Sequence, residues 1–362
     1  MKIGILTFHC AHNYGAVLQA YALQNFLEEQ GYDVEIIDYR PMYLICPYDL
    51  FSIRKNESVY GTIKTLINQV INIRKRYMRR KSFEKFITNN LRLSDKQYKN
   101  GKFDKIYDIY ILGSDQIWNN GITENDPIFW GEFEKKKNSI LITYAASTEG
   151  KNIKGELNFS SHKKDLNNFH NISVREKVLA DILQPLTTKI IKSVLDPTLL
   201  VSSEIFSSMM SLPKRQEKYI LIYQAIRDRN TWEIAKCMIK NTNLLIREII
   251  ADNIVMEDYF NKFSALSPES VLGLIKSAEY VVTTSFHGVA LSIVFKKQFI
   301  CIMNENRGNC RISSLLNRFG LEDRMVYDEN SIPKDTIDYD KIYKQLEGER
   351  KESVDFLLNA LQ

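Results

Sequence analysis

Short apolar strand patterns alternate with longer helical ones along almost the whole chain, and this alternation limits the possible folds more than any other feature. Residues 16–30 carry apolar side chains at helical spacing and stop at Gly31. Strand patterns cover residues 2–8, 33–38, 106–112, 139–145 and 172–174, and a second set covers 219–223, 244–250, 280–284 and 298–303. Alternation of this kind is typical of parallel sheets covered by helices on both faces.

The chain is long enough for two such sheets, because 362 residues exceed what a single core usually organises. Residues 202–218 are rich in serine, proline and charge, and they separate the two sets of strands. We therefore predict an α/β protein with two Rossmann-like, doubly wound domains facing a cleft. The first domain would cover residues 1–201 and the second residues 202–362. In the second, Ser267 and Pro268 predict a helix start.

Composition and charge exclude several classes of protein and of binding partner. Hydrophobic residues make up 44% of the chain and charged residues 26%, which excludes a disordered protein. The net charge of +5 suits an anionic small substrate and is too small to argue for nucleic acid. Five scattered cysteines favour reduced thiols, and the first residues predict a strand rather than a signal peptide. We expect a cytoplasmic protein that binds no nucleic acid.

The densest basic segment covers residues 74–86 and has two interpretations. It fits a solvated helix face, which is the commoner role of such a charge run. It also fits a peripheral contact with anionic lipid head groups at the inner face of the cell membrane, with Tyr77, Met78, Phe83 and Phe86 as a partial apolar side. Either way, no apolar run is long enough to predict a spanning helix.

Polar residues follow several of the predicted strands, where ligands bind in open parallel sheets. The strand over residues 280–284 ends in Ser285, His287 and Gly288. A histidine there can exchange a proton near neutral pH, Ser285 can donate a hydroxyl, and Gly288 leaves helix amides open to an anion. The alternative is a structural histidine with internal partners.

Two strand ends in the first half carry further candidates. Asn13 and Gly15 follow the first strand and can turn amide donors towards an anion, although the segment also fits a plain strand-to-helix turn. Asp115 follows Gly113 and Ser114 at the end of the strand over 106–112. It fits a general acid or base, or a helix cap.

Three arginines are candidates for an anion. Arg175 follows the strand over 172–174 and offers a planar fork to a carboxylate or phosphate, with a salt bridge to Glu176 as the alternative. Arg307 and Arg311 follow the strand over 298–303, or are plain surface charge. The run Asp196-Pro197-Thr198 is typical of a turn. The histidines lack metal-ligand spacing, and we expect no metal.

Six short motifs occur together in a fixed order and carry a resemblance. They are NYGAVLQAYAL (13–23), LGSDQIWN (112–119), YAAS (144–147), SVRE (173–176), DPTLL (196–200) and TSFHG (284–288). In this order they resemble the polysaccharide pyruvyl transferase family, from residue 3 to about residue 325. Many members of that family have arginine where this chain has Ser285.

The resemblance implies a two-domain fold like that of the GT-B glycosyltransferases. It also implies transfer of the pyruvyl group of phosphoenolpyruvate to two hydroxyls of a sugar, which forms a ketal and releases phosphate. The acceptor would belong to an exopolysaccharide, a capsule or a lipid-linked oligosaccharide. Phosphoenolpyruvate is then a donor substrate, and no cofactor is expected.

The resemblance points to His287 as the family's histidine, and the chemistry of the implied reaction suggests roles for the other candidates. His287 protonates the donor methylene or neutralises the leaving phosphate, and Asp115 takes protons from the acceptor hydroxyls. The expected donor-binding residues are Arg175, Ser285, Gly288, Arg307 and Arg311. The expected acceptor-binding residues are Asn13, Tyr14, Gly15, Ser114 and Asn119.

Two other classes of protein remain open at this point. A sugar-nucleotide-dependent glycosyltransferase has the same expected fold, and fold alone does not fix chemistry. It would use an acidic residue for the ribose hydroxyls, for which Asp252 and Glu279 are unremarkable candidates. A non-catalytic glycan-binding protein is less favoured, because polar residues gather at several separate strand ends.

Overall fold

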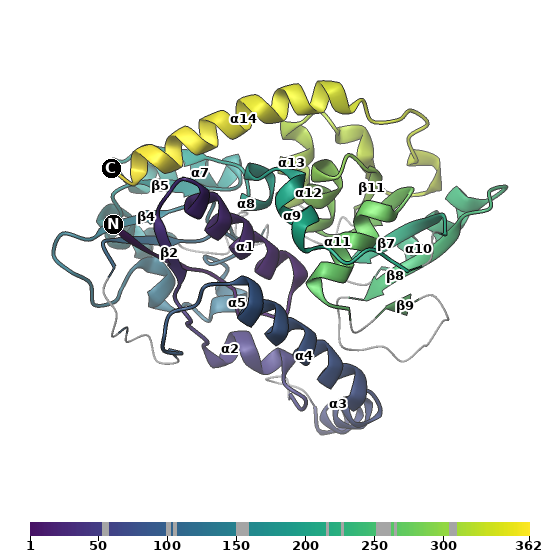
Figure 1. Cartoon of the computed structure of the whole chain (residues 1–362), viewed down its shortest axis with the longest axis horizontal. Helices are drawn as coiled ribbons and strands as arrows, with labels where there is room; N and C mark the ends of the chain where they lie inside the picture. The colour runs from purple at the N-terminus through teal and green to yellow at the C-terminus, as the bar shows by residue number, and fades with distance from the viewer. Residues whose placement is uncertain are drawn as a thin grey trace.

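The computed structural model describes residues 1–52, 58–98, 103, 107–149, 159–214, 217–225, 228–250, 262–263, 266–303 and 310–362. They form two parallel sheets with helices packed around them (Figure 1). The long last helix runs along one edge of the molecule, across both halves. The α/β prediction with two Rossmann-like units is confirmed.

The first sheet has the strand order β2-β1-β3-β4. β5 and β6 pair with each other and continue beside β4 through a bridge between Ile142 and Asn171. From β1 the chain goes to β2 on one side and to β3 on the other, so the strand order reverses between β1 and β3. The strands are β1 (Lys2–Leu6), β2 (Asp33–Ile36), β3 (Ile109–Leu112), β4 (Ile140–Thr143), β5 (Ile172–Val174) and β6 (Ile191–Ser193).

The second sheet repeats this plan with the order β12-β11-β10-β7-β8-β9 and all pairs parallel. Its order reverses between β7 and β10. The central strands are continuous apolar runs, as expected where helices cover both faces. The strands are β7 (Tyr219–Gln224), β8 (Leu245–Ile250), β9 (Lys262–Phe263), β10 (Tyr280–Thr283), β11 (Gln298–Ile302) and β12 (Met325–Val326).

Eight helices of the described residues belong to the first half of the chain. They are α1 (Tyr14–Glu29), α2 (Met42–Ile45), α3 (Val59–Ile71), α4 (Ile73–Asn90), α5 (Asn120–Thr123), α6 (Lys163–Asn168), α7 (Lys177–Leu183) and α8 (Pro197–Leu200). In the second half the described helices are α9 (Ser203–Met209), α10 (Arg229–Ile239), α11 (Pro268–Ser277), α12 (Phe286–Val294), α13 (Cys310–Arg318) and α14 (Tyr339–Ala360). None of these helices is long and apolar enough to cross a membrane.

The domain boundary after residue 201 stays a prediction. It falls between the last strand of the first sheet and the first strand of the second, and α14 crosses it. Arg350 of α14 donates to the carbonyls of Leu199 and Val201, and Ser353 accepts from the Leu195 amide at 3.0 Å. The last helix therefore fastens the second half of the chain to the end of the first.

The structure corrects two details. The passage over residues 202–218 contains helix α9, whose Phe206 is fully buried, because serine and charge occupy only its outer face. Of the described strands with two or three residues, β5 was predicted and β6, β9 and β12 were not, since so short a run seldom shows a period. The Ser267 cap with Pro268 in the first helical turn is confirmed.

Candidate active site

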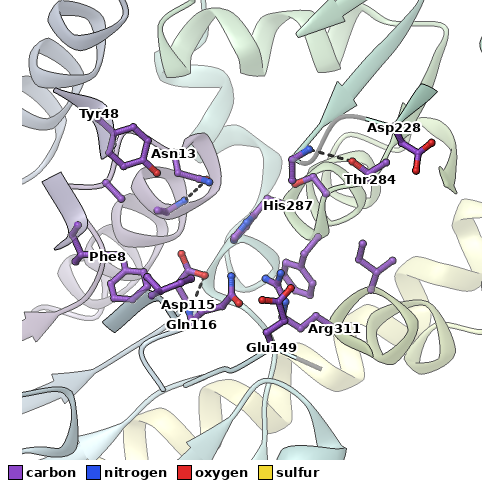
Figure 2. Close-up of a pocket in the computed structure, with 18 of the residues that line it drawn as sticks. Phe8, Asn13, Tyr48, Asp115, Gln116, Glu149, Asp228, Thr284, His287 and Arg311 are labelled. Atoms are coloured by element: carbon purple, nitrogen blue, oxygen red, sulfur yellow. Dashed lines mark hydrogen bonds between the residues drawn. The ribbon is translucent and has the colours of Figure 1, made fainter. Parts of the chain in front are cut away.

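A cavity lies between the two sheets, at the place where the strand order of each reverses. Loops after β1, β3, β7 and β10 all reach it, which is the position that open parallel sheets give to a ligand. It encloses about 1060 Å³ of empty space, including the part open to solvent. Figure 2 shows its polar lining, which includes Asn13, Asp115, Gln116, Glu149, Asp228, Thr284, His287 and Arg311.

His287 lies in the first turn of α12, directly after β10, as predicted. Ser285 caps this helix, and its hydroxyl accepts from the Gly288 amide at 3.4 Å. A Cβ at Gly288 would come within 2.2 Å of the Thr283 hydroxyl, so the tight return of the chain requires glycine there. Ser285 and His287 line the cavity, whereas the Gly288 amide is occupied by the cap.

The absence of a side chain at Gly15 allows His287 to contact the first half of the chain. A Cβ at Gly15 would lie 1.9 Å from His287 Nδ1, so the start of α1 is in direct contact with the imidazole ring. Any larger residue would displace the ring. Gly15 therefore acts by giving space to the histidine, a role that its position after a strand did not reveal.

Asp196 lies behind the histidine, although its sequence pattern indicated only a turn. Its Oδ2 is 3.6 Å from His287 Nε2, which is longer than a hydrogen bond, and Nε2 is buried without a hydrogen-bond partner among the described residues. Burial alone raises the pKa of Asp196, but the nearby His287 and the charge of Arg175 outweigh it, so this pKa is lowered. The carboxylate thus stays charged beside the imidazole.

Arg175 is fully engaged inside the protein. Its Nε donates to Glu176 Oε1, its Nη1 to Asp196 Oδ2 and its Nη2 to Ser147 Oγ, each at 2.9 Å. Burial lowers its pKa, but the two carboxylates outweigh this and raise it. Arg175 is not among the residues that line the cavity, so the salt bridge left open as its alternative role is the one observed.

Arg311 has the opposite environment. It lies in the first turn of α13, lines the cavity, and its Nε is buried without a hydrogen-bond partner in the described part of the chain. Burial and the charge of Arg175 lower the pKa of Arg311, with only partial compensation from Glu176 and Asp115. A desolvated cation of this kind favours an anion in the cavity. Arg307 lies outside the described residues.

Asp115 follows β3 with a φ of 73°, the left-handed conformation that aspartate tolerates better than most residues. One carboxylate oxygen accepts from the Gln116 amide at 2.9 Å, and the side chain lines the cavity (Figure 2). Glu149, which was not predicted, lines the same cavity. Asn119 holds two side chains of the cavity wall in place. Its amide nitrogen donates to Gln116 Oε1 at 2.9 Å and to Glu149 Oε2 at 3.4 Å.

Of the residues predicted to bind the acceptor, some line the cavity and others are buried in the protein interior. Asn13 lines the cavity, and its Oδ1 caps α1 by accepting from the Gly15 and Ala16 amides. Ser114 and Tyr14 are fully buried away from it: Ser114 donates to Asp196, and the Tyr14 hydroxyl donates to the Leu266 carbonyl. Their burial gives both a structural role. Tyr48 instead provides an aromatic ring on the cavity, without a sequence signal.

Across the described part of the chain, no group of three or more His, Cys, Asp or Glu side chains is placed to hold a metal ion. The expectation that the protein uses no metal stays a prediction.

The site and the fold agree with what sequence comparison finds. The chain belongs to the polysaccharide pyruvyl transferase family, whose model matches residues 13–306. This range includes Gly15, Asp115, Asp196 and His287. The family makes the protein a transferase with a glycan acceptor, and the resemblance carried by the six motifs is confirmed. No curated protein matches the sequence.

Solved structures with similar folds are distant in sequence. A putative UDP-N-acetylglucosamine 2-epimerase from Listeria monocytogenes has 9% identity and a TM-score of 0.49, covering 99% of this chain and 88% of that one. The Methanocaldococcus jannaschii UDP-GlcNAc 2-epimerase has 12% identity and a TM-score of 0.44, covering 96% and 92%. The E. coli heptosyltransferase WaaC has 11% identity and a TM-score of 0.37, covering 84% and 89%.

Proposed function

We propose that this transferase moves the pyruvyl group of phosphoenolpyruvate onto two hydroxyls of one sugar residue, forming a ketal and releasing phosphate. The acceptor would be part of an exopolysaccharide, a capsule or a lipid-linked oligosaccharide. The reaction would take place in the cytoplasm, in line with five unpaired cysteines. It needs no cofactor, because phosphoenolpyruvate itself is the activated donor.

The observation that carries this proposal is that His287 and Arg311 line one cavity, and that Arg311 has a buried Nε without a hydrogen-bond partner among the described residues. Phosphoenolpyruvate is a small dense anion with one carboxylate and one phosphate. The Arg311 guanidinium would bind one of these groups through charge-assisted hydrogen bonds. The Ser285 hydroxyl would donate a hydrogen bond to phosphoenolpyruvate as well. Arg175, saturated by Glu176 and Asp196, would position the site rather than bind the donor.

His287 would supply the proton for the first step. The buried Asp196 carboxylate faces Nε2 and favours a ring that carries a proton there, while Nδ1 lies at the Gly15 side. The charged imidazole would give its second proton to the methylene carbon of the donor, which becomes a methyl group. Positive charge then develops at the neighbouring carbon, which carries the phosphate oxygen. A positioned acid of this kind contributes roughly 10²–10⁴-fold in rate.

The acceptor hydroxyls would complete the reaction. The first hydroxyl oxygen bonds to the cationic carbon and gives up its proton to Asp115 or Glu149, the carboxylates that line the cavity. The carbon–oxygen bond to phosphate then breaks, and the second hydroxyl closes the ring with loss of its proton. Phosphoenolpyruvate and one diol thus give one ketal and one phosphate.

The test is phosphate release from phosphoenolpyruvate with a panel of sugar and lipid-linked sugar acceptors. We expect acceptor-dependent release by the wild-type chain and a fall of about 10²–10⁴-fold in His287→Gln. His162→Gln is the matched control, because His162 stacks on Trp130 at 3.7 Å and does not line the cavity. It should keep activity within about threefold of wild type, as remote substitutions usually do.

Rival donors give the contradicting outcome. UDP- and GDP-sugars are offered to the same acceptors under the same conditions. Consumption of a nucleotide sugar with phosphoenolpyruvate inert would replace the proposal with a glycosyltransferase reaction.

A further inference from the structure

The hairpin formed by α3 and α4 carries an exposed apolar face. Of the seventeen large apolar side chains that are exposed in the described part of the chain, nine fall within residues 59–78. They are Val59, Tyr60, Ile63, Ile67, Val70, Ile71, Ile73, Tyr77 and Met78. Apolar residues gathered in this way on a surface mark a contact site. In Figure 1 the hairpin lies at the lower edge of the molecule, away from α14.

The six exposed residues of α3 share one side of the helix. At 3.6 residues per turn they fall within an arc of about 120°, while Leu66 and Gln69 lie outside that arc. Val59, Tyr60 and Ile71 are 75–79% exposed, and Ile63, Ile67 and Val70 are 52–57% exposed. An apolar stripe that would normally face a core here faces outward along the whole helix.

The outer side of α4 continues this face and adds cations. Ile73, Tyr77 and Met78 are exposed, and so are the nearby cations Arg74 and Lys81. The sequence predicted that residues 74–86 form a surface patch, but the inner side of α4 packs against the protein. Its arginines Arg76 and Arg79 and its aromatics Phe83 and Phe86 are buried, so these two phenylalanines cannot supply an apolar contact.

Charge on the hairpin has one sign. Residues 58–90 contain eight lysines and arginines and a single acid, Glu84. Glu84 is occupied internally, because it accepts from Arg40 Nη1 and pairs with His12 Nε2 at 3.1 Å. The exposed cations Lys64, Arg74, Lys81 and Lys85 therefore border the apolar face with no acidic residue of the hairpin among them.

We propose that the outer face of the α3–α4 hairpin binds the surface of an anionic lipid bilayer. Apolar residues would enter the boundary between head groups and acyl chains, and the bordering cations would meet the anionic head groups. A second copy of the chain fits this face less well. A two-fold contact would bring the same cations of both copies together. The proposal is independent of the proposed reaction.

The hairpin is joined firmly to the wall of the cavity. Arg79 donates to the His12 carbonyl at 2.9 Å, in the loop that leads to Asn13. Arg76 donates to the carbonyl of Leu50 at 3.0 Å, and Arg80 pairs with Asp49 at 2.9 Å. Residues 49 and 50 directly follow Tyr48, which lines the cavity. A bilayer bound at the hairpin would therefore be held in a fixed relation to the site.

Vesicle flotation of the full chain tests this proposal. We expect binding to equimolar phosphatidylglycerol–phosphatidylcholine vesicles, weaker binding to pure phosphatidylcholine, and a decrease as salt rises. The double variant Ile67→Glu/Ile71→Glu should lose at least about a hundredfold in partition coefficient, since two exposed anchors are removed. The matched control is Ile190→Glu, at a residue that is 73% exposed outside the hairpin.

A fluorescence measurement separates insertion from loose attraction. Tyr60→Trp should shift its emission to shorter wavelength when anionic vesicles are added, and Ile190→Trp should not. Vesicle binding that survives in the double variant would overturn the proposal, and so would no binding by the wild type. A dimer in sedimentation that the double variant converts to monomer, without vesicle binding, would assign the face to a second copy instead.

Discussion

Arg175 at the end of β5 and Arg311 at the start of α13 are both arginines that follow strands of parallel sheets. Their environments nevertheless differ in hydrogen-bond partners and in the direction of the pKa shift. Arg175 is paired with two carboxylates and a hydroxyl, and its pKa is raised. Arg311 lines the cavity with an Nε that has no hydrogen-bond partner among the described residues, and burial lowers its pKa. The contrast indicates that the first half fixes the frame of the site and the second half leaves a cation for the ligand.

The histidines repeat this difference. In the first half, His9 lies 2.8 Å from Asp38 and His12 lies 3.1 Å from Glu84, within a network that Arg40 joins. In the second half, His287 has its facing carboxylate at 3.6 Å, beyond hydrogen-bond distance. A histidine with a tight internal partner stabilises the fold, whereas His287 lines the cavity without a carboxylate at hydrogen-bond distance among the described residues.

The largest expected difference between the two arginines is in the unfolding free energy of variants that lack each of them. Arg175→Met would leave the Asp196 and Glu176 carboxylates buried without their cation, which costs about 3–5 kcal/mol of unfolding free energy. Arg311→Met removes a buried charge that the neighbouring carboxylates compensate only in part, so the unfolding free energy should change by less than about 1 kcal/mol or rise. Urea unfolding of both variants measures this. Equal losses would show that both arginines serve the fold.

A substitution at Gly15 sharpens the account of how the halves meet. In Gly15→Ala the new Cβ would lie 1.9 Å from His287 Nδ1, so the ring must move. We expect a stability loss of about 1–3 kcal/mol from overpacking, with a fall in kcat that exceeds the change in KM. The matched control is Gly348→Ala in α14, where a Cβ meets open space and should stabilise the helix by up to about 1 kcal/mol. Unchanged kcat in Gly15→Ala would contradict this arrangement.

The smallest expected effect concerns acid stability of the first half. Burial raises the pKa of Glu84, but His12 and Arg40 outweigh it and lower the pKa to about 2, against an ordinary value of 4.5. The folded state therefore gains stability above about pH 4.5 and loses it as the pH falls towards 2. Glu84→Gln should reduce this acid-dependent loss in urea unfolding. Glu352→Gln, an exposed glutamate of α14, serves as control.

A slope that is as steep in Glu84→Gln as in the wild type would show that other carboxylates dominate acid unfolding.

Sequence predicted most of what depends on local pattern. Most of the described strands were predicted because their apolar runs are continuous, and His287, Ser285 and Asp115 were placed correctly because they follow strands. The six ordered motifs predicted the family. What the pattern could place is thus the loop on which a side chain lies.

Sequence did not predict what depends on contacts between distant segments. The sequence around Asp196 indicated only a turn, because its neighbours Ser114, Arg175 and His287 come from three other segments of the chain. Arg175 looked available, since neighbouring residues usually point apart, yet it reaches Glu176. Tyr14 looked like a sugar contact until α4 placed Arg79 over its ring.

We propose that Arg311, and not Arg175, is the arginine that binds the phosphoenolpyruvate donor. Calorimetric titration of phosphoenolpyruvate into the wild-type chain and into Arg311→Met tests it most directly. We predict binding by the wild type and an affinity about tenfold to a hundredfold lower in the variant, the loss expected for a buried hydrogen-bonded ion pair, with unchanged thermal unfolding. Equal affinity in the two proteins would contradict the account.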